Sequence, residues 1–118
     1  MLLDHIQLAI PINEEANART FYGDLLGLQE LEKPDALKAR GGCWFQVEAL
    51  QFHLGVEADF KPAKKAHPAF RVIDYDSLQQ RLEQAGFIVT PDDMLKDIER
   101  FYTHDPFGNR LEFIKETD

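Results

Sequence analysis

The stretch His5-Ile6-Gln7-Leu8-Ala9-Ile10 returns about 60 residues later as His67-Pro68-Ala69-Phe70-Arg71-Val72. Both stretches have the form His-x-x-apolar-x-apolar, and each precedes a helical pattern that ends in glycine. A unit of this length that occurs twice indicates a duplicated module, because common solenoid repeats are shorter and more numerous. Each half of the chain is therefore expected to open with a strand followed by a helix.

The rest of each half predicts three further strands. The first helix is expected to have Asn13 as its N-cap and Gly27 just past its end, and the second to begin near Asp74 or Asp76 and to stop at Gly86. Strands are expected at 28–33, 39–48 and 50–57, then at 87–91, 100–105 and 110–116, with a loop at 92–99. The prediction is an α+β protein of two βαβββ modules with curved mixed sheets that enclose a metal-lined cavity.

Length and composition limit the number of domains, the cellular location and the partners that can be expected. With 118 residues, 44% of them hydrophobic, residues 1–118 are expected to form a single domain, with modules at about 1–57 and 67–118 and a linker at 58–66. No apolar run suits a bilayer and no signal peptide is apparent, so a soluble cytoplasmic protein without a membrane partner is expected. The single cysteine agrees with a reducing compartment. A net charge of -8 argues against nucleic acid as a partner, and the basic stretch 61–65 is expected to be a solvated linker.

Four ligand-type residues stand out once the strands are given faces. Alternation along a strand places these side chains opposite the apolar ones, and the repeat pairs His5 with His67 and His53 with Glu112. Taken alone, each histidine would be an ordinary surface or hydrogen-bonded residue, but the symmetry favours a shared divalent transition-metal site. An N/O ligand set does not choose among Fe, Mn, Ni, Co and Zn. His104 has no repeat partner and is expected not to be a ligand.

Four stretches resemble the vicinal oxygen chelate superfamily, which comprises glyoxalase, bleomycin-resistance and extradiol-dioxygenase proteins. They are Asp4-His5-Ile6-Gln7-Leu8-Ala9-Ile10, Phe21-Tyr22-Gly23-Asp24-Leu25-Leu26-Gly27-Leu28, the module start at His67, and Asp105-Pro106-Phe107-Gly108-Asn109-Arg110-Leu111-Glu112-Phe113. The resemblance covers nearly the whole chain. It implies paired βαβββ modules around a metal that chelates neighbouring oxygen atoms of a substrate, and it is more specific for the fold than for the reaction.

The resemblance also implies roles for individual residues. His5, His67 and Glu112 fall where the fosfomycin-resistance thiol transferases and glyoxalase I have metal ligands, and Glu112 would also take part in catalysis. His53 falls at the fourth ligand position of glyoxalase I, where bacterial enzymes have Glu, and this departure weakens a glyoxalase assignment. Tyr102 matches a cavity tyrosine of the fosfomycin enzymes and is a second catalytic candidate, although a strand tyrosine is more often a core residue. A homodimer with sites shared between subunits, or closed within each, is a further implication.

Three functions remain open from the sequence. The first is a metal-dependent enzyme of the lyase, thiol-transferase or ring-cleaving dioxygenase type acting on a small oxygenated or electrophilic molecule. Its candidate substrate contacts are Gln7, Trp44, Gln46, Arg71, Arg100 and Tyr102. The second is a non-catalytic protein that sequesters a drug or metabolite, with Trp44, Phe45 and Phe101 as pocket walls. The third treats the histidines as pH-sensitive cavity residues without a metal.

Overall fold

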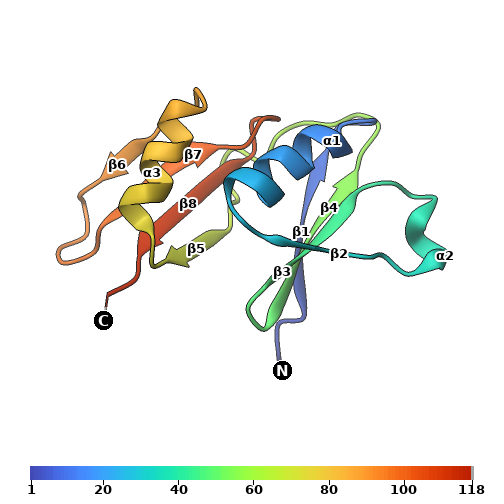
Figure 1. Cartoon of the computed structure of the whole chain (residues 1–118), viewed down its shortest axis with the longest axis horizontal. Helices are drawn as coiled ribbons and strands as arrows, with labels where there is room; N and C mark the ends of the chain where they lie inside the picture. Colours follow the sequence, from blue (N-terminus) through green and yellow to red (C-terminus); the bar gives the residue numbers. More distant parts are fainter. Residues whose placement is uncertain (118) are drawn as a thin grey trace. The chain divides into compact units, whose positions relative to one another are not determined.

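The structure, a computed structural model, describes residues 1–117 and divides into two compact units. Unit 1 spans Met1–Pro62 and unit 2 runs from Ala63 onward, so the division falls inside the expected linker. Each unit holds one open four-stranded mixed sheet with few helices (Figure 1), which confirms the predicted α+β fold of two βαβββ modules. No helix in the described part of the chain has the length and apolarity that crossing a membrane requires.

Unit 1 builds its sheet in the order β1-β4-β3-β2. β1 runs parallel to β4, and the other neighbours are antiparallel. A helical segment lies against one face of this sheet and buries Ala18, Phe21 and Tyr22. The elements of unit 1 are β1 (His5–Ile10), α1 (Glu15–Ala18), η1 (Arg19–Leu25), β2 (Gln29–Leu31), α2 (Asp35–Lys38), β3 (Cys43–Val47) and β4 (Leu50–Val56).

The first helix differs from the prediction at its start and in its winding. Asn13 is not the N-cap: its φ is 64°, α1 begins at Glu15, and Glu14 precedes it without a capping side-chain bond. Asn13 tolerates this left-handed turn because its short polar side chain is suited to it. The helix then widens into the π-helical segment η1, where the N–H of Leu26 donates to the carbonyl of Phe21, 2.9 Å away. The apolar face is kept, but the regular 3.6-residue period is not.

The segment between β2 and β3 is also different. The predicted strands 28–33 and 39–48 shrink to Gln29–Leu31 and Cys43–Val47, and the short helix α2 lies between them. Gly41 and Gly42 have φ values of 73° and 84°, which a strand ladder does not accommodate. Pro34 followed directly by an acidic residue is the helix-start signal that the strand prediction passed over.

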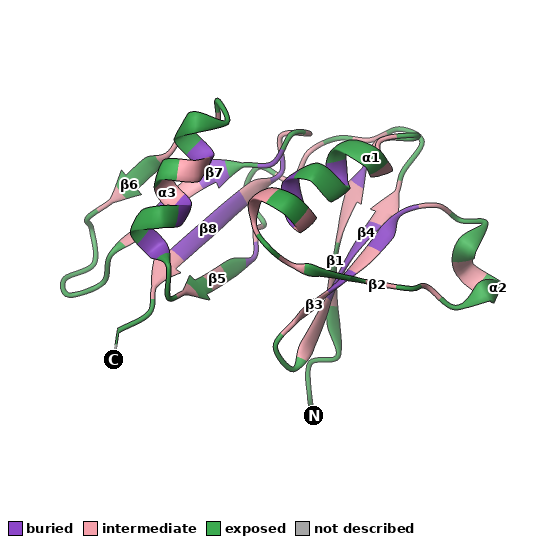
Figure 2. Cartoon of the chain, viewed as in Figure 1, coloured by how far each residue is buried: buried purple, intermediate pink, exposed green. Residues whose placement is uncertain are grey.

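Unit 2 repeats the plan with a longer helix. Its sheet has the order β5-β8-β7-β6, with β5 parallel to β8. The helix α3 covers one face and buries Tyr75, Leu78 and Leu82, while the central strand β8 is largely buried (Figure 2). The predicted strand 87–91 is only partly confirmed, because the observed strand β6 begins at Thr90 and ends at Asp92, and the predicted loop 92–99 contains no helix. The elements of unit 2 are β5 (Ala69–Val72), α3 (Tyr75–Gln84), β6 (Thr90–Asp92), β7 (Arg100–His104) and β8 (Arg110–Lys115).

Strand registers show how closely the two units correspond. In unit 1, His53 of β4 pairs with Gln7 of β1 and with Trp44 of β3. In unit 2, Glu112 of β8 pairs with Ala69 of β5 and with Tyr102 of β7. His53 and Glu112 therefore hold the same place in their sheets, and so do Trp44 and Tyr102.

Candidate functional site

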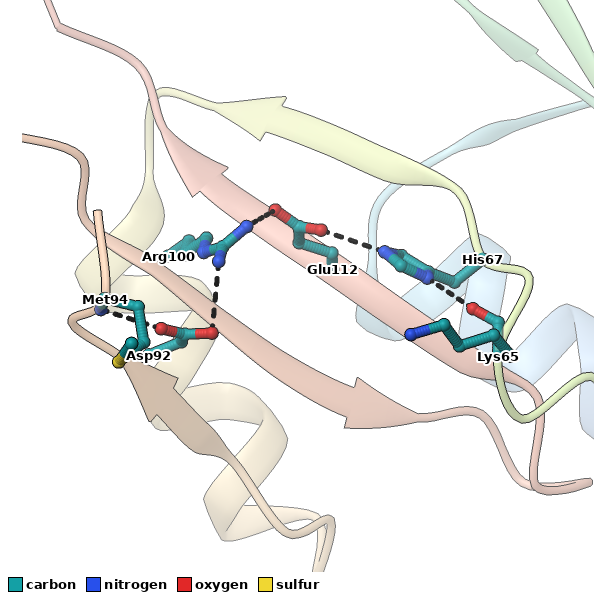
Figure 3. A network of polar contacts seen from close by, with 6 residues as sticks. All are labelled: Lys65, His67, Asp92, Met94, Arg100 and Glu112. Carbon is teal, nitrogen blue, oxygen red and sulfur yellow. Dashed lines mark hydrogen bonds and ion pairs between the residues drawn. The ribbon is translucent and has the colours of Figure 1, made fainter.

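In unit 2 a histidine and a carboxylate meet on the sheet face opposite α3. His67 lies just before β5, and its Nε2 is 2.9 Å from Oε1 of Glu112 on β8 (Figure 3). Glu112 is only 5% exposed, although it is an acidic residue in a strand. A buried carboxylate needs charged or polar partners to offset its lost hydration, so the surroundings of Glu112 decide its state.

Arg100 supplies the second partner of Glu112. The guanidinium donates from Nη1 to Oε2 of Glu112 at 3.2 Å and from Nη2 to Oδ2 of Asp92 at 3.1 Å (Figure 3). Burial would raise the pKa of the Glu112 carboxyl, but the hydrogen bonds from His67 and Arg100 outweigh it, and the pKa is lowered. Glu112 is therefore held as a carboxylate. Nε of Arg100 is buried and has no hydrogen-bond partner within residues 1–117.

The other ring nitrogen of His67 fixes its tautomer. Nδ1 lies 2.8 Å from the backbone carbonyl of Lys65, which can only accept, so Nδ1 carries the proton and donates (Figure 3). In a neutral ring, Nε2 then presents a lone pair to an ionised carboxylate oxygen. Two lone pairs at 2.9 Å repel, so this arrangement requires a proton or a metal cation between the two atoms.

In unit 1 the corresponding face holds a stack of three rings. His53 stacks between the Trp44 indole, 3.8 Å away at an angle of 3°, and the His5 imidazole, 4.2 Å away at 18°. Nδ1 of His5 donates to Oδ2 of Asp4, and Nε2 of His53 donates to Oε1 of Gln51, each at 2.9 Å. Burial lowers the pKa of His53, and the neighbouring charge of His5 lowers it further, so His53 favours the neutral form.

Each unit thus brings together two of the four predicted ligands. Within residues 1–117, no group of three or more His, Cys, Asp and Glu side chains gathers closely enough to hold a metal ion. His104 is exposed at the end of β7. The structure therefore supplies two half-sites, one imidazole pair and one imidazole–carboxylate pair, each on the sheet face away from the helices.

Comparison with known proteins identifies the family to which this chain belongs. The sequence profile of the Glyoxalase/Bleomycin resistance protein/Dioxygenase superfamily matches residues 2–113. The chain belongs to this superfamily. No curated protein has a sequence similar enough to match it.

Solved structures of glyoxalase-superfamily proteins have the same fold. A glyoxalase family protein from Bacillus anthracis is 47% identical, with a TM-score of 0.93 over 99% of this chain and 96% of that one. A glyoxalase/dioxygenase from Nostoc punctiforme is 20% identical, with a TM-score of 0.80 over 99% and 92%. The fosfomycin resistance protein FosX from Listeria monocytogenes is 16% identical, with a TM-score of 0.78 over 99% and 94%. The last two show the fold alone.

Four of the six predicted substrate contacts line a cavity, two in each unit. Gln7 and Trp44 line a cavity of about 170 Å³ in unit 1, and Arg71 and Arg100 line one of about 150 Å³ in unit 2. Gln46 is already engaged, because its amide Nε2 donates to the backbone carbonyls of residues 48 and 50 in the β3–β4 turn.

Tyr102 and Arg71 differ in how firmly they are held. The ring of Tyr102 lies edge-on to His67, with centroids 5.6 Å apart, and Arg110 sits 4.1 Å above its centre. Arg71 is 63% exposed, with Glu116 at 3.9 Å as a loose partner. Tyr102 is therefore held in a fixed position, although it lines neither of the two cavities, whereas the exposed Arg71 is free to reorient.

Two expected pocket walls are wrong. Phe45 and Phe101 have no exposed surface, because each points to the core side of its strand beside Phe52 or Phe113. Sequence reasoning also missed Asp92, which holds Arg100, and the cations Lys33 and Arg40, which line the unit 1 cavity. The alternation of β3 and β7 would have placed both phenylalanines in the core, but the two cations lie outside any strand.

Proposed function

We propose that this chain is a metal-dependent enzyme that acts on a small oxygenated or electrophilic molecule. The proposed ligands are His5, His53, His67 and Glu112, brought around one divalent ion either within one chain or between two copies. When bound, the ion would supply Lewis-acid polarisation and a template for two neighbouring oxygen atoms. The reaction type is that of a lyase, a thiol transferase or a ring-cleaving dioxygenase.

One observation carries the metal proposal. The three histidines among the proposed ligands each donate one ring N–H to an oxygen atom: His5 to a carboxylate, His53 to a side-chain amide and His67 to a backbone carbonyl. Metal-binding histidines nearly always have such a partner, because it fixes the tautomer and directs the other nitrogen's lone pair to the ion. The residues present therefore fit a metal of the N/O-binding type.

The chain's own groups have distinct roles in this proposal. Arg100 keeps Glu112 ionised and oriented, so that the carboxylate is ready to bind a cation or to accept a proton from a substrate. Tyr102 is the cross-strand partner of Glu112 and also lowers the pKa of its carboxyl, which puts a phenol beside the same carboxylate. His53 is held by stacking on both faces of its ring as well as by its hydrogen bond, so its ring orientation is fixed.

Metal content tests the proposal directly. Protein purified without an affinity tag or chelator should carry about one transition metal per chain or per shared site, measured by elemental mass spectrometry. His5→Ala and Glu112→Ala should lose the metal, whereas His104→Ala, which removes an exposed histidine outside the set, should keep it. Metal-free protein that also fails to take up added Fe, Mn, Ni, Co or Zn would overturn the proposal.

The aromatic stack favours a second candidate, a sequestering protein without chemistry. Trp44, which stacks on His53, lines the unit 1 cavity and offers an aromatic wall to a planar ligand, and bleomycin-resistance proteins belong to the same superfamily. A double variant His5→Ala/Glu112→Ala that still binds its ligand with unchanged affinity would favour this candidate. Loss of binding together with loss of metal would favour the enzyme.

A further inference from the structure

The unit 1 cavity has a composition that sets it apart from the rest of the chain. Its volume is about 170 Å³, and its lining side chains include Gln7, Lys33, Leu37, Arg40, Trp44 and Val56. Two of these are cations and no Asp or Glu lines the cavity, although the whole chain has 21 acidic against 13 basic residues. A positive cavity in a protein of net charge -8 selects for an anionic group.

The local backbone holds the cations in place. Lys33 precedes α2 and its ammonium donates to the backbone carbonyl of Gly41, which ties the two ends of the connection together. Arg40 follows α2, and its backbone N–H donates to the backbone carbonyl of Leu37 at 3.1 Å. No carboxylate within residues 1–117 forms an ion pair with Arg40, so its guanidinium is available to a ligand. Glu15 interacts with the charge of Lys33, but its carboxylate accepts the N–H of Gly42 and does not line the cavity.

The remaining walls suit a small planar body. Trp44, Leu37 and Val56 provide aromatic and aliphatic surface, and Gln7 provides one amide. An engineered apolar cavity of about 150 Å³ is known to bind benzene, so a cavity of similar volume accommodates one six-membered ring. A carboxylate attached to such a ring would reach the cations at the cavity wall, where charge-assisted hydrogen bonds from Arg are the strongest neutralising contacts.

We infer that the unit 1 cavity binds a small planar carboxylate, with Arg40 and Lys33 on the carboxylate and Trp44 against the ring. This inference rests on the proposed function, because it names the class of substrate that the enzyme would take. The cavity also adjoins the proposed ligands. Trp44 stacks directly on His53, and Gln7, which pairs with His53 across the strands, packs its amide against Gly55.

Benzoate is the probe, and benzyl alcohol is its neutral counterpart. Trp44 is the only tryptophan, so its fluorescence reports occupancy of the cavity directly. In metal-free protein, benzoate should change the fluorescence saturably and bind about tenfold more tightly than benzyl alcohol, because only benzoate engages the cations. Metal-free protein is used so that benzoate cannot act as a ligand of the ion.

Two variants each remove one positive charge, one at the cavity and one in the adjacent helix α2. Arg40→Gln should weaken benzoate binding by about fivefold or more, since a partly exposed charge-assisted hydrogen bond is lost. Lys38→Gln is the control, because Lys38 lies in α2, pairs with Glu32 and Asp35, and does not line the cavity. The affinity of this variant for benzoate should stay within about twofold of that of the parent protein. Both positions are exposed, so neither substitution should prevent folding.

The outcomes separate this inference from the proposed function. Saturable benzoate binding that is weakened about fivefold or more in Arg40→Gln and stays within about twofold in Lys38→Gln supports the cavity, even if the protein proves unable to bind any metal. Equal binding of benzoate and benzyl alcohol, equal losses in the two variants, or no saturable binding overturns it. If the protein holds a stoichiometric metal but gives one of these three results, the proposed function stands and the carboxylate site is excluded.

Discussion

Gly42 is expected to tolerate no side chain, and the cost can be worked out from its surroundings. A Cβ built on Gly42 would lie 2.1 Å from the carbonyl oxygen of Leu54, a backbone atom of the neighbouring strand that cannot swing away. Its φ of 84° adds a penalty of about 1 kcal/mol for any residue with a Cβ. Overpacking against fixed atoms adds about 1–3 kcal/mol, so Gly42→Ala should lower the free energy of unfolding by about 3 kcal/mol.

Two other glycines provide matched controls for the backbone penalty. Gly27 and Gly86 have φ values of 81° and 92°, and a Cβ on either would meet nothing within 4 Å. Gly27→Ala and Gly86→Ala should therefore cost only about 1 kcal/mol each. The difference of about 2 kcal/mol isolates the clash with Leu54.

Urea denaturation followed by circular dichroism measures this difference. With a slope of about 1–3 kcal/mol per M, the midpoint of Gly42→Ala should lie roughly 1 M below those of the two controls. If all three variants unfold at the same urea concentration, the close approach of Gly42 to β4 contributes nothing to stability and the reasoning is refuted.

Four further results are expected. Burial raises the pKa of the Cys43 thiol to about 11, so at pH 8 native protein should react with Ellman's reagent at least about a hundredfold more slowly than unfolded protein; rapid labelling would contradict this. The N–H of Gly42 lowers the pKa of Glu15 below its unfolded value, so this carboxylate stabilises the fold above about pH 4.3 and the contribution is lost as pH falls through the folded pKa. Glu15→Gln should flatten that part of the stability profile, and an unchanged profile would exclude this role. Asp105 is buried and accepts three hydrogen bonds from the turn that follows it, so Asp105→Ala should cost about 3 kcal/mol in thermal or urea unfolding, against less than about 0.5 kcal/mol for the exposed Asp93→Ala. Bound metal should leave on acidification from neutral pH to about pH 5, because protonated imidazoles do not coordinate; constant metal per chain over this range would argue against histidine ligands.

The sequence predicted the features that depend on period and repetition. The duplicated start of each module and the two-residue alternation of the strands were sufficient to assign the fold and to place His53 and Glu112 at equivalent positions. These features depend on neighbouring residues or on the internal repeat, so the order of residues along the chain is enough to predict them. The same alternation should have assigned Phe45 and Phe101 to the core, and taking them as pocket walls ignored it.

The features that were missed depend on how the backbone turns between strands. Lys33 and Arg40 are separated in sequence by the short helix α2, and they share a cavity because the chain turns back through α2, where the Lys33 ammonium donates to the carbonyl of Gly41. No spacing rule reports such a turn. The stack of Trp44 on His53 was missed for a related reason, because it depends on the register between β3 and β4 as well as on which face each residue occupies.

Lys33 and Arg40 lie on a connection, whereas His5 and His53 lie on paired strands. A strand residue is locked to its neighbours by the register, so inserting or deleting one position would turn every following side chain to the other face. The connection from Lys33 to Gly41 can change in length, sequence or charge without moving any ladder bond. Selection could therefore alter what this cavity accepts while leaving the histidines untouched, which is one way for a single duplicated scaffold to diversify.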